Sequence, residues 1–147
     1  MLDTIGSILG RKQSEIWCVT PRASVYSAIA LMAQKSIGAV LVMEDHKLVG
    51  IVTERDYARK VILQGRSSKE TRVDEIMTGE LIVVTPENTV DECMILMTER
   101  RVRHLPVLDR GKLVGIVSIG DLVNAVIADQ AHTISQLQTY IGSKYPA

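Results

Sequence analysis

Two short pairs of polar side chains have the types and spacing needed to bind a phosphorylated ligand. Thr53 and Asp56 lie three residues apart, and Ser118 and Asp121 repeat that spacing. Each pair follows Gly-Ile-Val at the expected end of a strand and opens an expected helix, where unpaired N–H groups and the positive dipole end favour phosphate. The hydroxyl adds one hydrogen bond, and the carboxylate can accept two from the cis-diol of a ribose.

The same two pairs also match the capping box of a helix start. In that arrangement the hydroxyl caps the first turn, and the acid at the third helical position reaches back to the cap residue. Either pair, taken alone, fits this structural role well. The two roles can coexist, and the residue pattern leaves both open.

Both pairs belong to one sequence repeat with an offset of sixty-five residues. The phrase LVGIVTERD at positions 48–56 returns as LVGIVSIGD at positions 113–121. The same offset superposes Val-Thr-Pro at 19–21 on 84–86 without a gap. A fixed period indicates one supersecondary unit built twice, with the open faces of the two units buried against each other. We therefore expect any functional site in two related copies.

Each copy is predicted to fold as β-α-β-β-α, which makes the fold class α/β. A short β-prone segment, 16–20 or 81–85, runs into a proline, and a helix follows whose apolar residues recur at i, i+4 and i+7. Two Val- and Ile-rich runs around a tight polar turn then predict an antiparallel hairpin, at 39–52 and 104–117. A second helix opens at the hydroxyl residue of each pair.

Breaks in these patterns divide the chain into five parts. The helical pattern of the first copy stops near Gly65, and the end of the second copy stays helix-compatible to about Tyr140. We expect apolar residues of this last helix to pack on a partner or on the N-terminal segment: Leu122, Ile127, Ile134, Leu137 and Ile141. The predicted parts are an N-terminal segment (1–15), a first domain (16–69), a linker (70–78), a second domain (79–128) and a C-terminal helical tail (129–147).

Bulk composition argues against several classes of function. The 147-residue chain has a formal net charge of zero, so no global field attracts nucleic acid. Its apolar runs are far shorter than the ~18 residues of a membrane span, and its N-terminus lacks the layout of a secretory signal. Cys18 and Cys93 are expected to be buried apolar side chains, and the three scattered histidines predict no metal site. We expect a reduced, cytoplasmic protein.

Together these motifs resemble a CBS-domain pair, also called a Bateman module, and in particular small bacterial stand-alone CBS proteins. The resemblance covers roughly Ile16 to Ala128. It rests on the tandem repeat, the signature Gly-hydrophobic-hydrophobic-Thr/Ser-x-x-Asp, the Val-Thr-Pro entries, Leu-Pro-Val at 105–107 and the linker at 73–78. It implies two repeats packed as a pseudo-twofold pair, with adenosine nucleotides bound in two clefts between the domains.

The resemblance also assigns residues to those clefts. It implies that the signature Asp holds the ribose hydroxyls and that the signature Thr or Ser lies near the ribose or phosphate. The start of the middle strand lines each cleft, while the Thr before proline and the apolar residue two before the signature hydroxyl flank the base. With the positions that differ between copies, the implied nucleotide-binding residues are Thr20, Ile37, Gly38, Ala39, Ile51, Thr53, Arg55, Asp56, Thr85, Val102, Arg103, His104, Ile116, Ser118, Gly120 and Asp121.

The two copies differ where the ligand is expected. Gly38-Ala39 in the first copy corresponds to Arg103-His104 in the second, and Glu54-Arg55 corresponds to Ile119-Gly120. Each copy thus supplies basic residues from a different element, and in a pseudo-twofold pair Arg55, Arg103 and His104 are expected to serve one shared phosphate region. Because no nucleophile or paired carboxylate accompanies His104 at a legible spacing, we expect no catalytic residues.

The sequence therefore predicts a regulatory module for energy or redox sensing, not an enzyme. AMP is the first expected ligand and NAD(H) stands nearly level, since a dinucleotide can span both clefts; ATP and ADP follow, and S-adenosyl compounds are disfavoured. Binding is expected to signal to an unknown effector protein by conformational change, and the resemblance implies a homodimer. We expect no catalytic cofactor, nucleic acid or membrane partner. The alternative is a structural interaction or dimerisation module without a physiological nucleotide ligand.

Overall fold

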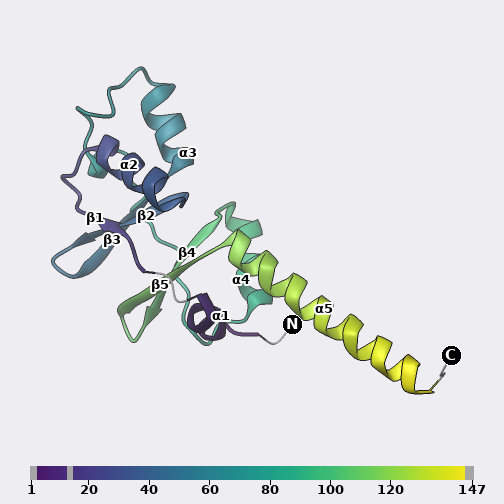
Figure 1. Cartoon of the computed structure of the whole chain (residues 1–147). Helices are drawn as coiled ribbons and strands as arrows, with labels where there is room; N and C mark the ends of the chain where they lie inside the picture. The colour runs from purple at the N-terminus through teal and green to yellow at the C-terminus, as the bar shows by residue number, and fades with distance from the viewer. Residues whose placement is uncertain (1–2, 13–14, 145–147) are drawn as a thin grey trace. The chain divides into compact units, whose positions relative to one another are not determined.

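The computed structural model describes residues 3–12 and 15–144, which form two compact units (Figure 1). The first-copy unit comprises Glu15–Val83. The second-copy unit joins Val84 onward to the segment that precedes Glu15. Each unit thus contains one copy of the repeat, and the second also contains the N-terminal helix.

The first-copy unit is a three-stranded sheet with a helix packed on it. Strand β1 (Cys18–Val19) pairs in parallel with β2 (Ala39–Glu44), which pairs antiparallel with β3 (Lys47–Thr53). Helix α2 (Val25–Lys35) precedes β2; α3 (Glu54–Tyr57) follows β3 and continues as the π-helical turn η1 (Ala58–Ile62). The core joins buried residues of α2, the sheet, η1 and the linker: Val25, Ala28, Met32, Val40, Val42, Val52, Val61, Val73 and Ile76.

The second-copy unit repeats the hairpin and both flanking helices. Its elements are α1 (Ile5–Lys12), α4 (Val90–Arg100), β4 (His104–Asp109), β5 (Lys112–Ser118) and the long α5 (Ile119–Lys144). Strands β4 and β5 pair antiparallel, as predicted. Leu9 of α1 covers the backbone of β5 so closely that a Cβ at Gly115 would lie 2.7 Å from its Cδ2 atom.

The prediction of a strand at 81–85 is wrong, because only an isolated β-bridge forms there. Val84 pairs in parallel with Val107 through two hydrogen bonds, from its N–H to the carbonyl of Pro106 and to its carbonyl from the N–H of Leu108. In the first copy the N–H of Leu41 also donates to the carbonyl of Trp17. Pro106 occupies the position of Leu41 in the repeat and has no N–H, so the corresponding bond cannot form.

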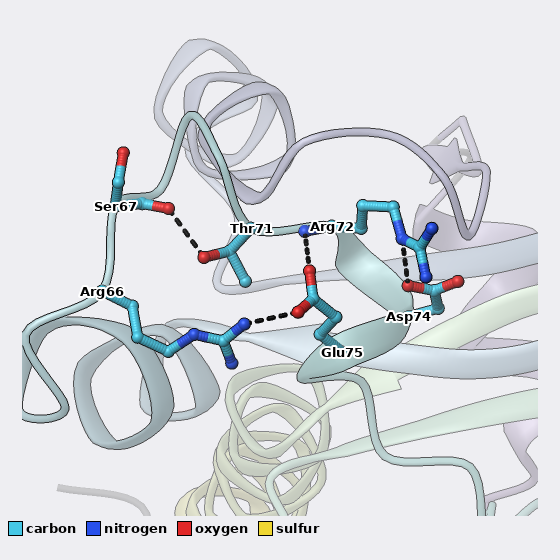
Figure 2. A network of polar contacts seen from close by, with 6 residues as sticks. All are labelled: Arg66, Ser67, Thr71, Arg72, Asp74 and Glu75. Carbon is cyan, nitrogen blue, oxygen red and sulfur yellow. Dashed lines mark hydrogen bonds and ion pairs between the residues drawn. The ribbon is translucent and has the colours of Figure 1, made fainter.

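The linker between the copies is built into the first-copy unit. Val73 and Ile76 are fully buried, and backbone hydrogen bonds join Val25 to Thr71 (2.8 Å) and Val73 to Ala23 (2.8 Å). Figure 2 shows the polar contacts that hold the short 3₁₀ turn η2 (Val73–Glu75) in place. The carboxylate of Glu75 accepts hydrogen bonds from the backbone N–H of Arg72 and the guanidinium of Arg66, which lower its pKa.

Both hairpins have a two-residue turn in which both residues have positive φ. The values are 50° and 63° for Asp45 and His46, and 53° and 80° for Arg110 and Gly111. This geometry belongs to the type I′ turn, which matches the twist of the strands. His46 therefore occupies a left-handed position where the second copy has glycine.

Exchanging these turn residues should change stability in opposite directions. His46→Gly relieves the left-handed strain and is expected to raise the free energy of unfolding by roughly 0.5 kcal/mol, whereas Gly111→His should lower it by about 1 kcal/mol. Urea denaturation of both variants measures the two changes. A shift of the same sign in both would contradict the assignment of the strain to the turn.

Two further expectations can be compared with the structure. Cys93 is buried as expected, and its burial raises the pKa of its thiol to about 11. The expectation for Cys18 is wrong: it is exposed, because β1 is a two-residue strand at the edge of the sheet. Among the described residues no helix is long and apolar enough to cross a membrane.

Candidate nucleotide-binding site

In the first-copy unit, Thr53 and Asp56 form a complete capping box at the start of α3. The Oδ2 atom of Asp56 accepts hydrogen bonds from the backbone N–H of Thr53 (2.9 Å) and from its hydroxyl (3.0 Å), while the N–H of Asp56 donates to the Thr53 hydroxyl (3.1 Å). The Nζ atom of Lys60 lies 3.1 Å from the Oδ1 atom of Asp56. Both carboxylate oxygens of Asp56 therefore have partners within its own unit.

In the second-copy unit, Ser118 and Asp121 form the same box at the start of α5. The Oδ2 atom of Asp121 accepts from the backbone N–H of Ser118 (2.8 Å), and the N–H of Asp121 donates to the Ser118 hydroxyl (3.2 Å). Here the cation is Lys12 of α1, whose Nζ atom lies 2.9 Å from Oδ2 of Asp121 and 3.0 Å from the carbonyl oxygen of Ile116. The structural interpretation of both pairs as helix caps is confirmed.

The start of the middle strand lies beside each pair. Ala39 is the register partner of Thr53, and the N–H of Glu54 donates to the carbonyl of Gly38 (3.1 Å). His104 is the partner of Ser118, and the N–H of Ile119 donates to the carbonyl of Arg103 (2.8 Å). Each unit thus brings the candidate residues of its hairpin to one end of its sheet.

The remaining candidates are distributed around this edge. Ile51 and Ile116 lie two residues before the signature hydroxyls and therefore on the same strand faces as those hydroxyls. Ile37 and Val102 enter the middle strands directly from the preceding helices, with their N–H groups bonded to the carbonyls of Met32 and Met97. Arg55, Arg103 and Gly120 are exposed.

Two candidates lie away from the signature pairs within their units. Thr20 follows Val19, whose partner on β2 is Val42, three residues beyond Ala39. Thr85 follows Val84, whose partner is Val107, three residues beyond His104. Strand geometry puts these threonines about 10 Å or more along the sheet from the hydroxyl–carboxylate pairs. A contact of either threonine with a nucleotide base stays a prediction of the resemblance.

Lys12 affects the pKa values of two side chains at the second-copy pair, those of Asp121 and His104. Partial burial alone would raise the pKa of Asp121, but the hydrogen bonds from Lys12 and the Ser118 backbone outweigh it and lower this pKa. Burial, and next the charge of Lys12, lower the pKa of His104, while Asp121 opposes them. His104 is therefore neutral at pH 7, and Lys12 is the cation nearest the carboxylate. That Arg55, Arg103 and His104 share one phosphate region stays a prediction.

Sequence reasoning missed Lys12 as a member of this site. It lies 109 residues before Asp121, in a segment that belongs to neither copy of the repeat. No periodicity or motif links the two positions. By contrast, Lys60 lies four residues after Asp56 on a helix, a spacing at which opposite charges are known to pair.

A groove adjoins Asp121 in the second-copy unit. Its volume is about 620 Å³, and α1 and α5 form its walls, with Ile8 and Lys12 on one side and Asp121, Ala125 and His132 on the other. Among residues 3–12 and 15–144, no group of three or more His, Cys, Asp or Glu side chains is placed to hold a metal ion.

The fold and the site together define a class of protein: two α/β repeats, each with a hairpin that ends in a hydroxyl–carboxylate pair at a helix start. The family model described as "CBS domain" matches residues 6–62 and 73–128. The chain therefore belongs to the CBS-domain family and contains a tandem pair of these domains.

Relatives at higher and lower similarity agree with this assignment. The mitochondrial CBS domain-containing protein CBSX3 of Arabidopsis thaliana is 47% identical over 90% of this chain, which spans 66% of the plant protein. A putative signal-transduction protein with CBS domains from Burkholderia ambifaria is 59% identical, with a TM-score of 0.83 over 86% of this chain and 96% of that one. The CBS pair of protein MJ0100, solved with 5′-methylthioadenosine and S-adenosyl-L-methionine, shares the fold at 24% identity, with a TM-score of 0.77 over 88% of this chain and 99% of that one.

Proposed function

We propose that the protein is a regulatory module that binds an adenine nucleotide through its two signature pairs. The observation that carries this proposal is the repeated geometry at the hairpin ends, where a hydroxyl, a carboxylate and a helix start lie beside the first residues of the middle strand. Capping does not use every acceptor position of such a carboxylate, because its two oxygens offer about four positions for hydrogen bonds. In Asp121, Oδ2 accepts the hydrogen bonds from Lys12 and from the backbone N–H of Ser118.

AMP is the first ligand that we propose, with NAD(H) next and ATP or ADP after them. The MJ0100 complex supports the general class, since a CBS pair of the same fold holds adenosine-containing molecules. The cations beside the carboxylates, Lys60 and Lys12, favour a ligand that carries phosphate. That the ligand lies in clefts between the two domains stays a prediction from the resemblance.

Ligand binding then signals to a separate effector protein, whose identity stays open to experiment. Such coupling requires that the nucleotide bind one of two conformations more tightly than the other. We further propose that the protein is a homodimer and acts without enzymatic turnover. A cytoplasmic location also stays a prediction, and the plant relative CBSX3 is named as mitochondrial.

Thermal unfolding with AMP, ADP, ATP or NADH tests this function. A nucleotide present at 100 times its dissociation constant should stabilise the protein by about 2.7 kcal/mol, and AMP and NADH should raise the melting temperature most. The nucleotides recovered afterwards should be chromatographically unchanged. The absence of a shift with all four at millimolar concentration would overturn the proposal.

One observation favours the alternative of a structural module without a ligand. Each signature carboxylate already has two functions in its own unit, as a helix cap and as the partner of a lysine. On this alternative the pairs only stabilise the helix starts. Mass spectrometry of small molecules that copurify with the protein separates the two cases, because a sensor should retain an adenine nucleotide and a structural module should not.

A further inference from the structure

Helix α5 extends beyond the other elements of its unit and is exposed from Ile127 to Ile141. Figure 1 shows the C-terminal half of α5, coloured green to yellow, running past α4, β4 and β5. Every residue from Ile127 to Ile141 is exposed, whereas Leu122 and Ala125 at the start of the helix are buried. Isolated helices of this length are marginal in water, and the β-branched residues in this stretch have low helix propensity. The exposed half therefore needs a packing partner.

Apolar residues recur on this half with the spacing of a coiled coil. From Val123, alternating steps of four and three residues reach the other members of a stripe that we call the α5 seam: Val123, Ile127, Gln130, Ile134, Leu137 and Ile141. Its three isoleucines are 54–58% exposed and occupy heptad position a, while Leu137 occupies d and is 56% exposed. Isoleucine at a with leucine at d favours two parallel strands.

The α5 seam lies on the opposite side of the helix from α1. Asp121, Ala125 and His132 face the groove that α1 borders. Successive residues turn by about 100° in an α-helix, so the centre of the seam lies roughly 180° from this face. Pairing through the seam thus leaves the Lys12–Asp121 contact in place. Ile127, Ile134, Leu137 and Ile141 thus face away from α1, whereas Leu122 is buried in the second-copy unit.

Charge indicates which partner fits the seam. The segment from Gln130 to Ile141 contains no Asp, Glu, Lys or Arg. The flanking e and g positions are also uncharged: Asn124, Val126, Ala131, Thr133, Gln138 and Tyr140. A second copy therefore places no like charges opposite each other, whereas an acidic or basic partner meets no complementary charge. A membrane surface fits poorly, because interfacial helices carry Lys or Arg on their polar face.

We propose that two copies of this chain associate through the α5 seam as a parallel, two-stranded coiled coil with twofold symmetry. In each protomer the first turns of α5 are already folded within the second-copy unit, so pairing does not have to nucleate a helix. A twofold interface uses the same surface on both copies, as the self-complementary seam allows. This inference assigns an interface to the proposed self-association and is independent of nucleotide binding.

Sedimentation equilibrium of three proteins tests the interface. The wild type should be a dimer, Ile134→Asp at the centre of the seam should be a monomer with half the mass, and Gln136→Asp on the opposite face should stay a dimer. Both substitution sites are exposed and outside the core, and thermal unfolding equal to that of the wild type would verify that the two variants are folded. A monomeric wild type at high concentration overturns both the inference and self-association. A dimeric Ile134→Asp protein overturns the inference alone.

Cysteine cross-linking tests the parallel orientation. In a Cys18→Ser background, Ile127→Cys and Ile141→Cys should each form a covalent dimer on mild oxidation, because parallel a positions face each other. Gln136→Cys is the control and should stay uncross-linked. If neither seam cysteine cross-links with itself, the parallel coiled coil is wrong.

Discussion

Replacing Asp56 and Asp121 together by alanine should abolish measurable binding of AMP and NADH while the protein stays folded. If the carboxylates hold the ribose hydroxyls, each substitution removes charged hydrogen bonds that contribute ~1.5–3 kcal/mol. A loss of this size raises the dissociation constant roughly 10- to 150-fold at each site. Isothermal titration calorimetry of the two single variants and the double variant measures the loss and shows which pair contributes more.

The control must separate the loss of a ligand contact from the loss of a helix cap. Thr89 caps α4 through a hydrogen bond from the N–H of Glu92 (3.2 Å). It caps the first helix of the second copy, whereas Ser118 and Asp121 lie at the start of the last helix of that copy. Thr89→Ala should cost about 1 kcal/mol of stability without changing the nucleotide affinity. If Asp56→Ala and Asp121→Ala bind nucleotide as tightly as the wild type, both pairs are only caps.

Lys12→Met should destabilise the second-copy unit at neutral pH and change its response to acid. The substitution removes the ammonium group from Asp121 but keeps an apolar side chain of similar length. Because both partners are partly exposed, with 27% and 19% of their side chains accessible, we expect a loss of about 0.5–1.5 kcal/mol in the free energy of unfolding. Arg11→Met is the matched control, since Arg11 pairs with Asp3 on the exposed side of α1.

The acid response follows from the two lowered pKa values beside Lys12. Asp121 and His104 both bind protons less readily in the folded chain than in the unfolded chain. Their contribution to stability is therefore complete above the unfolded pKa of histidine, ~6.5, and is lost as the pH falls through the folded values. In Lys12→Met both folded pKa values should rise, so the loss in acid should be smaller than in the wild type.

Urea denaturation at pH 7 and pH 4 measures this difference, and proton NMR of the histidine rings measures the pKa of His104 directly. An unchanged titration of His104 in Lys12→Met, with the ion pair removed, would contradict the electrostatic role of Lys12.

Features encoded by local periodicity were predictable from the sequence. The hairpins, the helices of the repeat and the signature pairs all depend on residues within about twenty positions of each other, and each pattern occurs twice in the chain. Helix α1 (Ile5–Lys12) lies outside the repeat and was not predicted. The shortened first strand of the second copy was not foreseen, although its cause is visible in the sequence: Pro106 replaces the donor that Leu41 supplies. The missing N–H of Pro106 predicts a shorter strand only when it is known which segment pairs with Pro106.

The contact of Lys12 with Asp121 could not be predicted in this way. It depends on where α1 packs, and α1 is held by backbone bonds to the loop before α4, from Ile5 to Asn88 and from Gly6 to Pro86, both 2.9 Å. No pattern within α1 indicates that loop as its partner. Long-range packing of a non-repeated segment is the kind of information that a single sequence does not display.

The packing of α1 on the second-copy unit also imposes an order of events during synthesis. Helix α1 is made before both copies of the repeat, yet its partners Pro86, Asn88 and Gly115 are made about eighty or more residues later. The first-copy unit, Glu15–Val83, is continuous and can fold as soon as it emerges. Helix α1 cannot pack, and Ile5 and Ile8 stay uncovered, until the second copy has been made. A segment that precedes both copies of the repeat in the sequence is thus among the last to reach its place in the folded chain.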